Sequence, residues 1–393
     1  MIAQFYGFDI HKEYVMVAAV DSAHQVSLKP QRIAMAELPE WAAQHLTRAD
    51  QAVLEVGSNA WPVIDILRAY AGQVSAANPY KTKLIAEARI KNDKVDALAL
   101  AQLLAAHFIP DVWVPDERVR EQRSLAAHRA TLQKQCTQIK NRVHHVLHRH
   151  NLRCPEPALF SAAGRAWLFA LTLPPTDALQ LRHLCQQLDV LQEELEETDR
   201  LIARLASQDP RVPYLLQVTG IGYYTAFAIL AAIGDIHRFS DPDQLAAYGG
   251  LVPRQHQSGG HNFYGHITKA GNPLLRWLMV EAARAAIRWD PHWRHVHDRL
   301  ARRRGSHIAV VAVARRLLVL VWHLLTKKEG YRYLQPQTFV TKLQQWATHI
   351  GHAHLPNPSI QDFVRSHLSA LGLDTLAASL TSNQRGRILV QSA

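Results

Sequence analysis

The sequence predicts an α/β domain, then a helical connector, then a mainly helical C-terminal domain. Three observations lead to this order. Short strand-like runs are confined to the first 115 residues, two long heptad-like apolar stripes follow, and helical patterns dominate after Val212. A chain of 393 residues exceeds what one hydrophobic core usually organises. We therefore divide it into residues 1–115, 116–210, 211–330 and 331–393.

The first region, residues 1–115, is predicted to form a mixed sheet flanked by helices. Its first two strand-like runs are joined by the polar residues His11, Lys12 and Glu13, which suggests a hairpin. Later runs are separated by segments with helical spacing of apolar residues. The expected strands are residues 5–9, 14–20, 52–56 and 73–77, and the expected helices are residues 61–70 and 94–107.

The connector, residues 116–210, carries two stripes of apolar residues at three-and-four spacing. One runs from Leu125 to Val146 and the other from Leu181 to Leu205, with proline-containing breaks between them. Two helices that face each other within the chain would bury these stripes, and so would a coiled coil with a second chain. The sequence leaves both arrangements open.

The last regions differ in how much they reveal. Residues 211–330 include a Gly220-Ile221-Gly222 turn before an apolar helix at residues 227–233, which suits a backbone contact to phosphate or an ordinary helix–helix turn. Residues 331–393 have mixed composition and are treated as an extension of unknown role.

Composition favours a nucleic-acid partner. Residues 1–115 hold 10 Lys+Arg against 12 Asp+Glu, whereas residues 116–393 hold 34 against 21. A basic field of this kind attracts polyanions, although a merely basic protein would show it too. The cysteines Cys136, Cys154 and Cys185 lack a disulfide or zinc spacing, which fits a reducing cytoplasm. With no leader pattern and no eighteen-residue apolar run, we expect no membrane association.

Four carboxylates stand at positions where an isolated charge is costly. Asp9 and Glu55 lie inside predicted strands, and Asp93 and Asp96 lie three residues apart at the start of a predicted helix. A shared cation would explain all four, and oxygen ligands select Mg²⁺ or Mn²⁺. Each acid alone also has a structural explanation, as a helix cap, a first-turn acid or a salt-bridge partner.

The segment after Leu251 combines a serine with cations. Ser258 lies between polar residues and the paired glycines Gly259 and Gly260, so it suits a turn and also suits nucleophilic attack if a base such as His256 or His261 assists it. We expect nucleic-acid contacts from two glycines and six basic residues: Gly220, Gly222, Arg254, Lys269, Arg276, Arg302, Arg303 and Arg304.

These pieces resemble the insertion-sequence-110 family of DEDD transposases over about residues 3–328. Three segments look like the carboxylate motifs of the family's ribonuclease H-like, resolvase-type domain: Gly7-Phe8-Asp9-Ile10-His11-Lys12, Leu54-Glu55-Val56-Gly57 and Lys91-Asn92-Asp93-Lys94-Val95-Asp96-Ala97. A second block is similar to the family's C-terminal transposase domain and includes Val218 to Ala226, Arg238-Phe239, Gly250-Leu251-Val252-Pro253 and Ser258-Gly259.

The resemblance implies a recombinase of an insertion sequence. Asp9, Glu55, Asp93 and Asp96 are then the metal-binding catalytic acids, and Ser258 is the nucleophile that forms a phosphoserine link to DNA. It further implies a coiled coil between the domains, a homo-oligomer (dimer or tetramer) and an element-encoded guide RNA that selects DNA. Such an enzyme is expected in the bacterial or archaeal cytoplasm, at the nucleoid. The tail after about Gly330 is longer than the family pattern predicts.

Two other functions fit the same residues. A structure-specific nuclease would use the four acids with water as nucleophile and would leave no covalent adduct. A non-catalytic nucleic-acid-binding protein would bind in the presence of chelator and would not cut.

Overall fold

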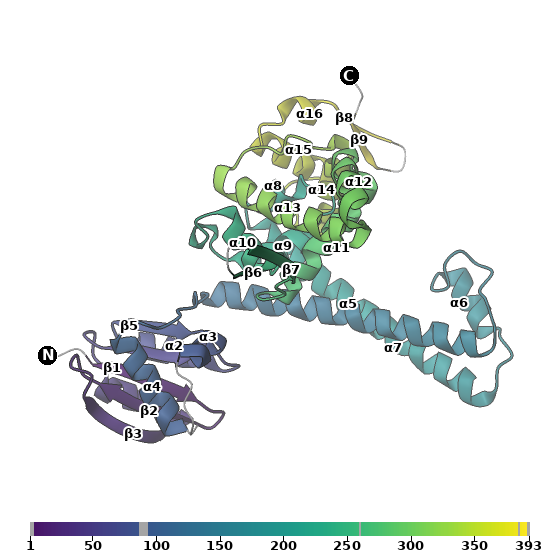
Figure 1. Ribbon diagram of the computed structural model, residues 1–393. Helices are drawn as coiled ribbons and strands as arrows, with labels where there is room; N and C mark the ends of the chain where they lie inside the picture. Colours follow the sequence, from purple (N-terminus) through teal and green to yellow (C-terminus); the bar gives the residue numbers. More distant parts are fainter. Residues whose placement is uncertain (1–3, 86–92, 259–260, 384–385, 391–393) are drawn as a thin grey trace. The chain divides into compact units, whose positions relative to one another are not determined.

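The computed structural model describes residues 4–85, 93–258, 261–383 and 386–390. The chain divides into two compact units, Met1–Asp116 and Glu117–Ala393 (Figure 1). The first unit is built on a five-stranded sheet, and the second is mostly helical. The mixed α/β character predicted for the start of the chain and the helical character predicted for the rest are therefore confirmed.

The sheet of the first unit has the strand order β3-β2-β1-β4-β5. Strands β1, β2 and β3 are antiparallel neighbours, and the register Phe5↔Val20 to Ile10↔Val15 makes β1 and β2 the expected hairpin. Strands β4 and β5 run parallel to β1. The strands are β1 (Phe5–Ile10), β2 (Tyr14–Val20), β3 (Val26–Ala34), β4 (Gln51–Glu55) and β5 (Gln73–Ala77).

Helices cover both faces of this sheet. Phe8, fully buried, packs with Leu38 of α1 and Ile64 of α2 on one face, whereas Phe5 packs with Leu100 of α4 on the other. A Cβ at Gly7 would lie 2.1 Å from the carbonyl oxygen of Ala97, so α4 rests directly on β1. The helices are η1 (Met35–Glu37), α1 (Leu38–His45), α2 (Ala60–Arg68), α3 (Pro79–Ile85) and α4 (Asp93–Ala105).

The second unit begins with a long helical hairpin of α5 (Glu117–Arg149) and α7 (Pro175–Ser207), joined through α6 (Ala162–Phe169). The two helices lie side by side and antiparallel (Figure 1). Arg129 pairs with Asp199 at 3.0 Å near the base, and Arg149 pairs with Asp177 at 2.8 Å near the tip. The two apolar stripes thus pack against each other within one chain.

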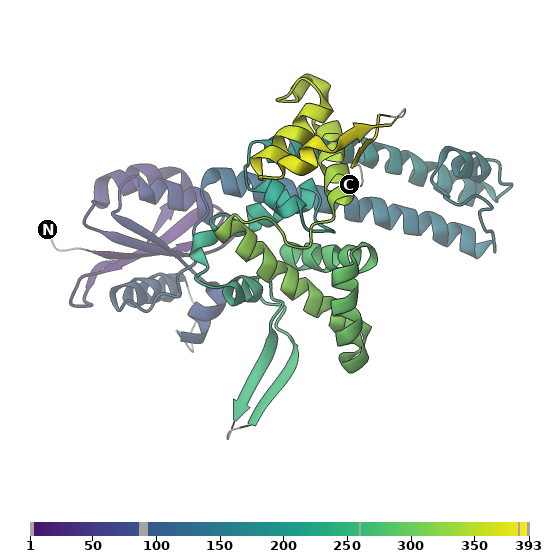
Figure 2. The same cartoon turned by 90° about the horizontal axis from the view of Figure 1, so that it is seen from above.

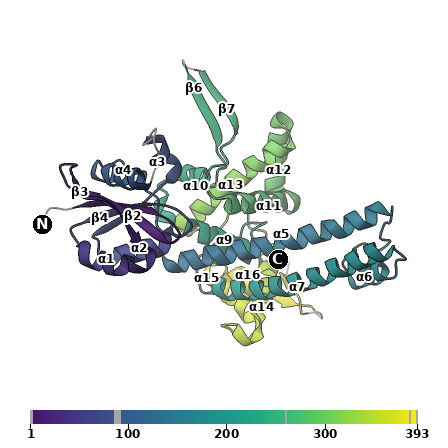
Figure 3. The same cartoon turned by 90° about the horizontal axis from the view of Figure 1, so that it is seen from below.

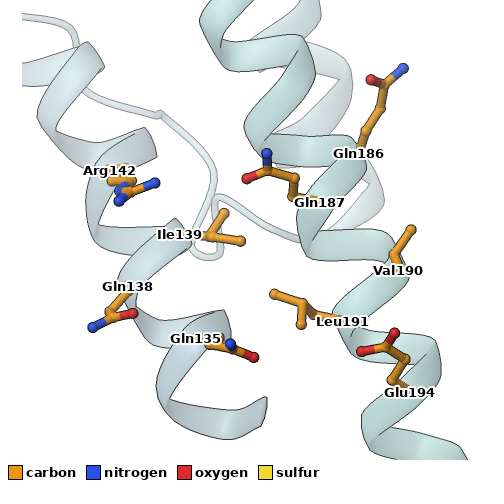
Figure 4. Close-up of a pocket in the computed structure, with 9 residues that line it drawn as sticks. All are labelled: Gln135, Gln138, Ile139, Arg142, Gln186, Gln187, Val190, Leu191 and Glu194. Atoms are coloured by element: carbon orange, nitrogen blue, oxygen red, sulfur yellow. The ribbon is translucent and has the colours of Figure 1, made fainter. Parts of the chain in front are cut away.

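A groove of about 520 Å³ lies between the two helices of this hairpin. Figure 4 shows its lining, in which Ile139 and Leu191 point toward one another and glutamine amides surround them. Val190 at its edge is 55% exposed. The lining contains no cluster of catalytic side chains, and the groove is a place where the helices are incompletely packed.

The remaining helices of the second unit surround one large core. A two-stranded ribbon, β6 (Pro253–Ser258) and β7 (His261–Ile267), extends away from these helices (Figures 2 and 3). The elements before α14 are α8 (Val212–Leu216), α9 (Tyr223–Ile233), η2 (Ile236–Arg238), α10 (Pro242–Tyr248), α11 (Pro273–Trp289), α12 (Pro291–Arg304) and α13 (Ser306–Lys327).

The described part of the C-terminal segment, residues 331–383 and 386–390, belongs to this same core. Phe339, Trp346 and Phe363 are buried in it, and the indole N–H of Trp346 donates to the carbonyl oxygen of Ala203 on α7 at 2.9 Å. The segment thus covers the base of the long hairpin. Its elements are α14 (Pro336–Ile350), η3 (His352–His354), α15 (Ile360–Ala370), α16 (Asp374–Ala378), β8 (Leu380–Ser382) and β9 (Ile388–Val390).

One helix, α13, is long and apolar enough to cross a membrane by length and composition. It packs inside the second unit, where Val313, Leu317 and Val321 are fully buried. Because the core helix of a soluble protein passes the same test, this helix is weak evidence for a membrane span.

Candidate active site

Two of the predicted acids lie at one edge of the sheet. In the parallel register of β1 and β4, Phe8 pairs with Leu54, so Asp9 and Glu55 are the next residues on the two strands. Val53, two residues before Glu55, packs on the α4 side, and so does Phe5 of β1. Because side chains alternate along a strand, Asp9 and Glu55 share that α4 face at the carboxyl ends of their strands.

The other two acids, Asp93 and Asp96, occupy the first turn of α4. There the helix dipole stabilises negative charge. The packing of α4 on β1 brings Asp93 back to the edge where Asp9 lies. The Nε2 atom of His11 lies 3.1 Å from Oδ2 of Asp9 and 3.2 Å from Oδ2 of Asp93, and the hydroxyl of Tyr14 donates to Asp93 at 2.9 Å.

The electrostatics of this cluster disfavour uncompensated negative charge. Burial raises the pKa of Asp9, the nearby His11 lowers it, and the charges of Asp93 and Asp96 raise it further, with a net upward shift. The hydrogen bond to Asp93 raises the pKa of Tyr14 because it holds the hydroxyl proton in place. A cation among these carboxylates would remove the repulsion that raises the pKa of Asp9.

The donor atoms suit a hard divalent ion. Ligand atoms of Asp9, His11 and Asp93 all lie within 4.8 Å of one another. Carboxylate oxygens are the ligands that Mg²⁺ and Mn²⁺ prefer, and an imidazole is accepted by Mn²⁺ more readily than by Mg²⁺. Asp96 is close enough to act on Asp9 electrostatically, and Glu55 lies on the neighbouring strand end, outside the group of three.

Two residues of this cluster, His11 and Tyr14, were not predicted from the sequence as site residues. The sequence pattern predicts His11 in a turn, and the structure places it between two carboxylates that are 84 residues apart. The available signal was spacing: His11 is two residues from Asp9, on the same side of the strand end. Its ring also stacks on Tyr14 with centroids 4.5 Å apart, which fixes its orientation.

Ser258 is the last residue of β6 and pairs with His261 across the ribbon. Its backbone therefore lies at the tip of β6–β7, and Gly259 and Gly260, which follow it, lie outside the described residues. Ser258 belongs to the second unit and the four acids belong to the first.

The two glycines of the predicted phosphate-binding turn have different environments. Gly220 has φ +93°, and a Cβ there would lie 2.3 Å from the carbonyl oxygen of Ala282, so glycine is needed for the turn to approach α11. Gly222 caps α9, and a Cβ there would meet nothing within 4 Å. Of the two, Gly222 has the open backbone that a ligand could approach.

The predicted nucleic-acid cations also fall into two classes. Arg254 and Lys269 are exposed, as are Arg302, Arg303 and Arg304 at the end of α12. Arg276 instead donates to the carbonyl oxygen of Gly249 at 3.4 Å and lies against Gly250, so it also supports the turn before β6.

Two family models match the chain. A DEDD transposase model of the IS110 group, described as "Transposase", matches residues 6–152, which include all four acids. A model described as "Transposase IS116/IS110/IS902 family" matches residues 212–298, which include Ser258.

Individual relatives agree with these matches. A "Probable family 20 transposase" of Pseudomonas aeruginosa is 31% identical over 260 residues, which is 62% of this chain and 75% of the relative. The "Transposase for insertion sequence element IS1111A" of Coxiella burnetii is 29% identical over 343 residues, covering 83% and 90% of the two chains. The chain therefore belongs to the IS110/IS116/IS902 family of transposases.

Proposed function

We propose that this transposase cuts and rejoins DNA by a metal-dependent reaction in which Asp9, Glu55, Asp93 and Asp96 hold Mg²⁺ or Mn²⁺ and Ser258 is the nucleophile. The observation that carries the metal assignment is the meeting of Asp9 and Asp93. Their carboxylates come from separate segments and lie within 3.2 Å of the same nitrogen atom. A cluster of acids this close is costly unless a cation compensates it.

The side chains of the first unit have distinct tasks in this proposal. The sheet edge presents Asp9 and Glu55, and the first turn of α4 presents Asp93 and Asp96. The Tyr14 hydroxyl donates a hydrogen bond of 2.9 Å to Asp93 and so orients its carboxylate. The Arg32 guanidinium lies 3.8 Å from the centroid of the Tyr14 ring and holds that ring in place. A bound divalent ion would activate the attacking oxygen and stabilise the leaving oxygen of phosphoryl transfer.

Ser258 would carry the covalent step. Its Oγ atom loses a proton and attacks phosphorus, and one bond between phosphorus and a deoxyribose oxygen breaks; that oxygen takes up a proton. The phosphoserine diester keeps the bond energy, so the reverse attack by a deoxyribose hydroxyl rejoins DNA. A position at the end of strand β6, in a two-stranded ribbon that extends away from the helices, suits a nucleophile that must reach a DNA phosphate.

Further parts of the proposal rest on family resemblance together with the fold. The strand order β3-β2-β1-β4-β5 supports a ribonuclease H-like first unit, and the long α5–α7 hairpin supports a coiled-coil role. We include an element-encoded guide RNA, a homo-oligomer and a cytoplasmic, nucleoid-associated location. An oligomer would allow acids from one chain to act with Ser258 of another.

The test is cleavage of labelled element-end DNA by the purified chain with Mg²⁺, with and without the element's RNA. Asp9→Asn should abolish cleavage and keep the fold. Ser258→Ala should abolish cleavage and the covalent adduct together and leave binding almost unchanged, because one hydroxyl adds little to an electrostatic interface.

The adduct also separates this proposal from the nuclease alternative. Peptide mapping of trapped wild-type adduct should place DNA on Ser258. Wild-type cleavage by Ser258→Ala without any adduct would favour a water-using nuclease, and an adduct on Tyr223, Tyr248 or Tyr264 would assign a different nucleophile. Binding that is indifferent to chelator, with no cutting, would favour the non-catalytic alternative.

A further inference from the structure

A short helix begins at the same sheet edge as the acids. In the parallel register of β4 and β5, Glu55 pairs with Ala77, and α3 (Pro79–Ile85) starts two residues later. The carboxyl ends of β1, β4 and β5 therefore present Asp9, Glu55 and the start of α3 in that order. Helix α3 follows directly from the strand next to Glu55.

The orientation of α3 is fixed by hydrogen bonds. The Oδ1 atom of Asn78 accepts from the backbone N–H groups of Tyr80 at 3.0 Å and Lys81 at 3.2 Å, and its carbonyl oxygen accepts from the Thr82 hydroxyl at 2.9 Å. Thr82 is buried. The opposite side of α3 is consequently held outward, toward solvent.

The outward side of α3 carries one aromatic ring and two cations. Tyr80 is 76% exposed, so most of its ring faces solvent. Lys81 and Lys83 on either side of Thr82 are also exposed. A single exposed tyrosine is ordinary. At helical spacing, however, Lys81 and Lys83 flank Tyr80 on the helix surface, and an aromatic ring flanked by cations is typical of sites that bind unstacked bases and their phosphates.

The charge distribution of the first unit supports a polyanion at this edge. The unit has more acids than bases overall, yet the exposed Lys12 and Lys94 lie within three residues of Asp9 and Asp93 in the chain, and Lys81 and Lys83 lie on α3. Arg48, by contrast, lies just before β4 and donates to the carbonyl oxygens of Arg68, Ala69 and Ala71 at the C-terminal end of α2. Cations at the acid edge offset repulsion between the carboxylates and an approaching phosphate backbone.

We propose that Tyr80, Lys81 and Lys83 form a DNA-strand contact in which Tyr80 stacks on an unpaired base next to the reacting phosphate and the lysines bind the flanking phosphates. The inference rests on the proposed function, because it places the reacting phosphate at the acids. It adds that the DNA is unstacked at the cleavage point, since a base within an intact duplex cannot reach the ring.

The first experiment detects the contact without any need for cleavage. The full-length chain is irradiated with a single-stranded oligodeoxynucleotide that contains 5-iododeoxyuridine, and the cross-linked peptide is identified. We expect the cross-link on Tyr80, its retention in Tyr80→Phe and its loss in Tyr80→Ala. Tyr80→Ala should weaken binding of the oligonucleotide at least about fivefold, and Tyr80→Phe should bind as the wild type does.

The second experiment uses the lysines. The double variant Lys81→Ala/Lys83→Ala should reduce the slope of log affinity against log salt by about 1.4, since each phosphate contact on a single strand contributes about 0.7. Lys29→Ala is the matched control, because Lys29 is an exposed lysine on β3 at the opposite side of the sheet, and its slope should equal that of the wild type.

The outcomes separate this inference from the proposed function. A Tyr80 cross-link from a chain that never cuts DNA would support the contact and contradict the catalytic proposal. Normal cleavage and affinity in Tyr80→Ala, with no cross-link on α3, would overturn the contact alone. Preferential cross-linking of an equivalent 5-iodouridine oligoribonucleotide to Tyr80 would also overturn it, because the occupant would then be RNA.

Discussion

Three arginines converge on the carbonyl end of α9. Arg123 of α5 donates to the carbonyl oxygens of Ala231 and Ala232, Arg238 donates to those of Ile233 and Ala232, and Arg211 donates to that of Gly234. Cations are stabilising there because the helix dipole ends in unpaired carbonyls. The basic excess of residues 117–393 is therefore partly structural, which no count of charges could show.

Loss of one of these arginines should destabilise the second unit. Burial lowers the pKa of Arg123 because the guanidinium has lost water, and the carbonyl oxygens that it binds replace part of that hydration. Arg123→Met should lower the free energy of unfolding by about 1.5–3 kcal/mol, the range for a hydrogen bond from a charged donor. Chemical denaturation measures this. The control, Arg299→Met on the exposed side of α12, should change stability by no more than about 0.5 kcal/mol.

A buried lysine gives the second unit a pH dependence of known sign. Lys342 of α14 donates to the carbonyl oxygens of Leu216 and Val218, and burial lowers its pKa to about 7, against 10.5 for the free side chain. Between these values the unfolded chain binds the proton and the folded chain does not. The free energy of unfolding should therefore rise with pH above about 7, toward 10.

Denaturation at several pH values tests this lysine. The unfolding free energy of the wild type minus that of Lys342→Met should increase as pH rises from about 7 to 9. Only the wild type has the lysine whose pKa differs between the folded and unfolded chains, so only the wild type gains stability from it. Asp290, fully buried, is the acid whose charge opposes the shift. Parallel pH curves for the two proteins would show that Lys342 keeps its proton or is not buried.

At the scale of the helix and strand, the elements that the sequence predicted are those in which apolar residues pack against a core. Strands β1, β2 and β5 are apolar runs that are mostly buried, helix α2 repeats apolar residues at helical spacing, and the apolar pattern located all four within about two residues. Strand β3 was not predicted, because it is a largely exposed edge strand and contains Pro30. Helix α1 was not predicted either, since it is only 8 residues long and begins Leu38-Pro39.

The acids of the candidate site could be predicted from the sequence, whereas the contacts of His11 and Tyr14 could not. Strand alternation and the three-residue spacing of Asp93 and Asp96 pointed to the acids, because both are local patterns. The contacts of His11 and Tyr14 with Asp93 depend on α4 packing across β1 and β2, which is a tertiary event. Their roles could not be read from residues that are neighbours in the chain.

Helix α14 supplies a prediction at this scale. Its apolar residues Phe339, Leu343, Trp346 and Ile350 recur at helical spacing and are buried, although composition alone gave the segment no role. Trp346→Ala should cost about 3–5 kcal/mol of unfolding free energy, as large-to-small core changes do. Trp289→Ala is the control: Trp289 is 65% exposed, and its loss should leave the denaturation midpoint nearly unchanged.

For the whole molecule, the division of charge predicts where nucleic acid binds most strongly. Residues 116–393 hold 34 Lys+Arg against 21 Asp+Glu, and the exposed arginines of α12 are among them. A fragment of residues 117–393 should keep most of the affinity for duplex DNA and lose it steeply as salt increases. Binding that is insensitive to salt, or that follows the 1–116 fragment, would contradict this distribution.

The long hairpin has a mechanical consequence. Helix α5 is held near its start by Arg123 and by Arg129, whose guanidinium lies 4.3 Å from the ring centroid of Tyr224 on α9, and beyond that point it continues for about 30 Å to Arg149. A small rotation of α5 about its contacts with α9 would therefore be magnified at the distant end of the helix. A rotation of about 5° at these contacts moves the tip by roughly 3 Å, the length of a hydrogen bond. A shift of α9 that rotates α5 would thus produce a larger displacement at the far end of the hairpin, near Arg149.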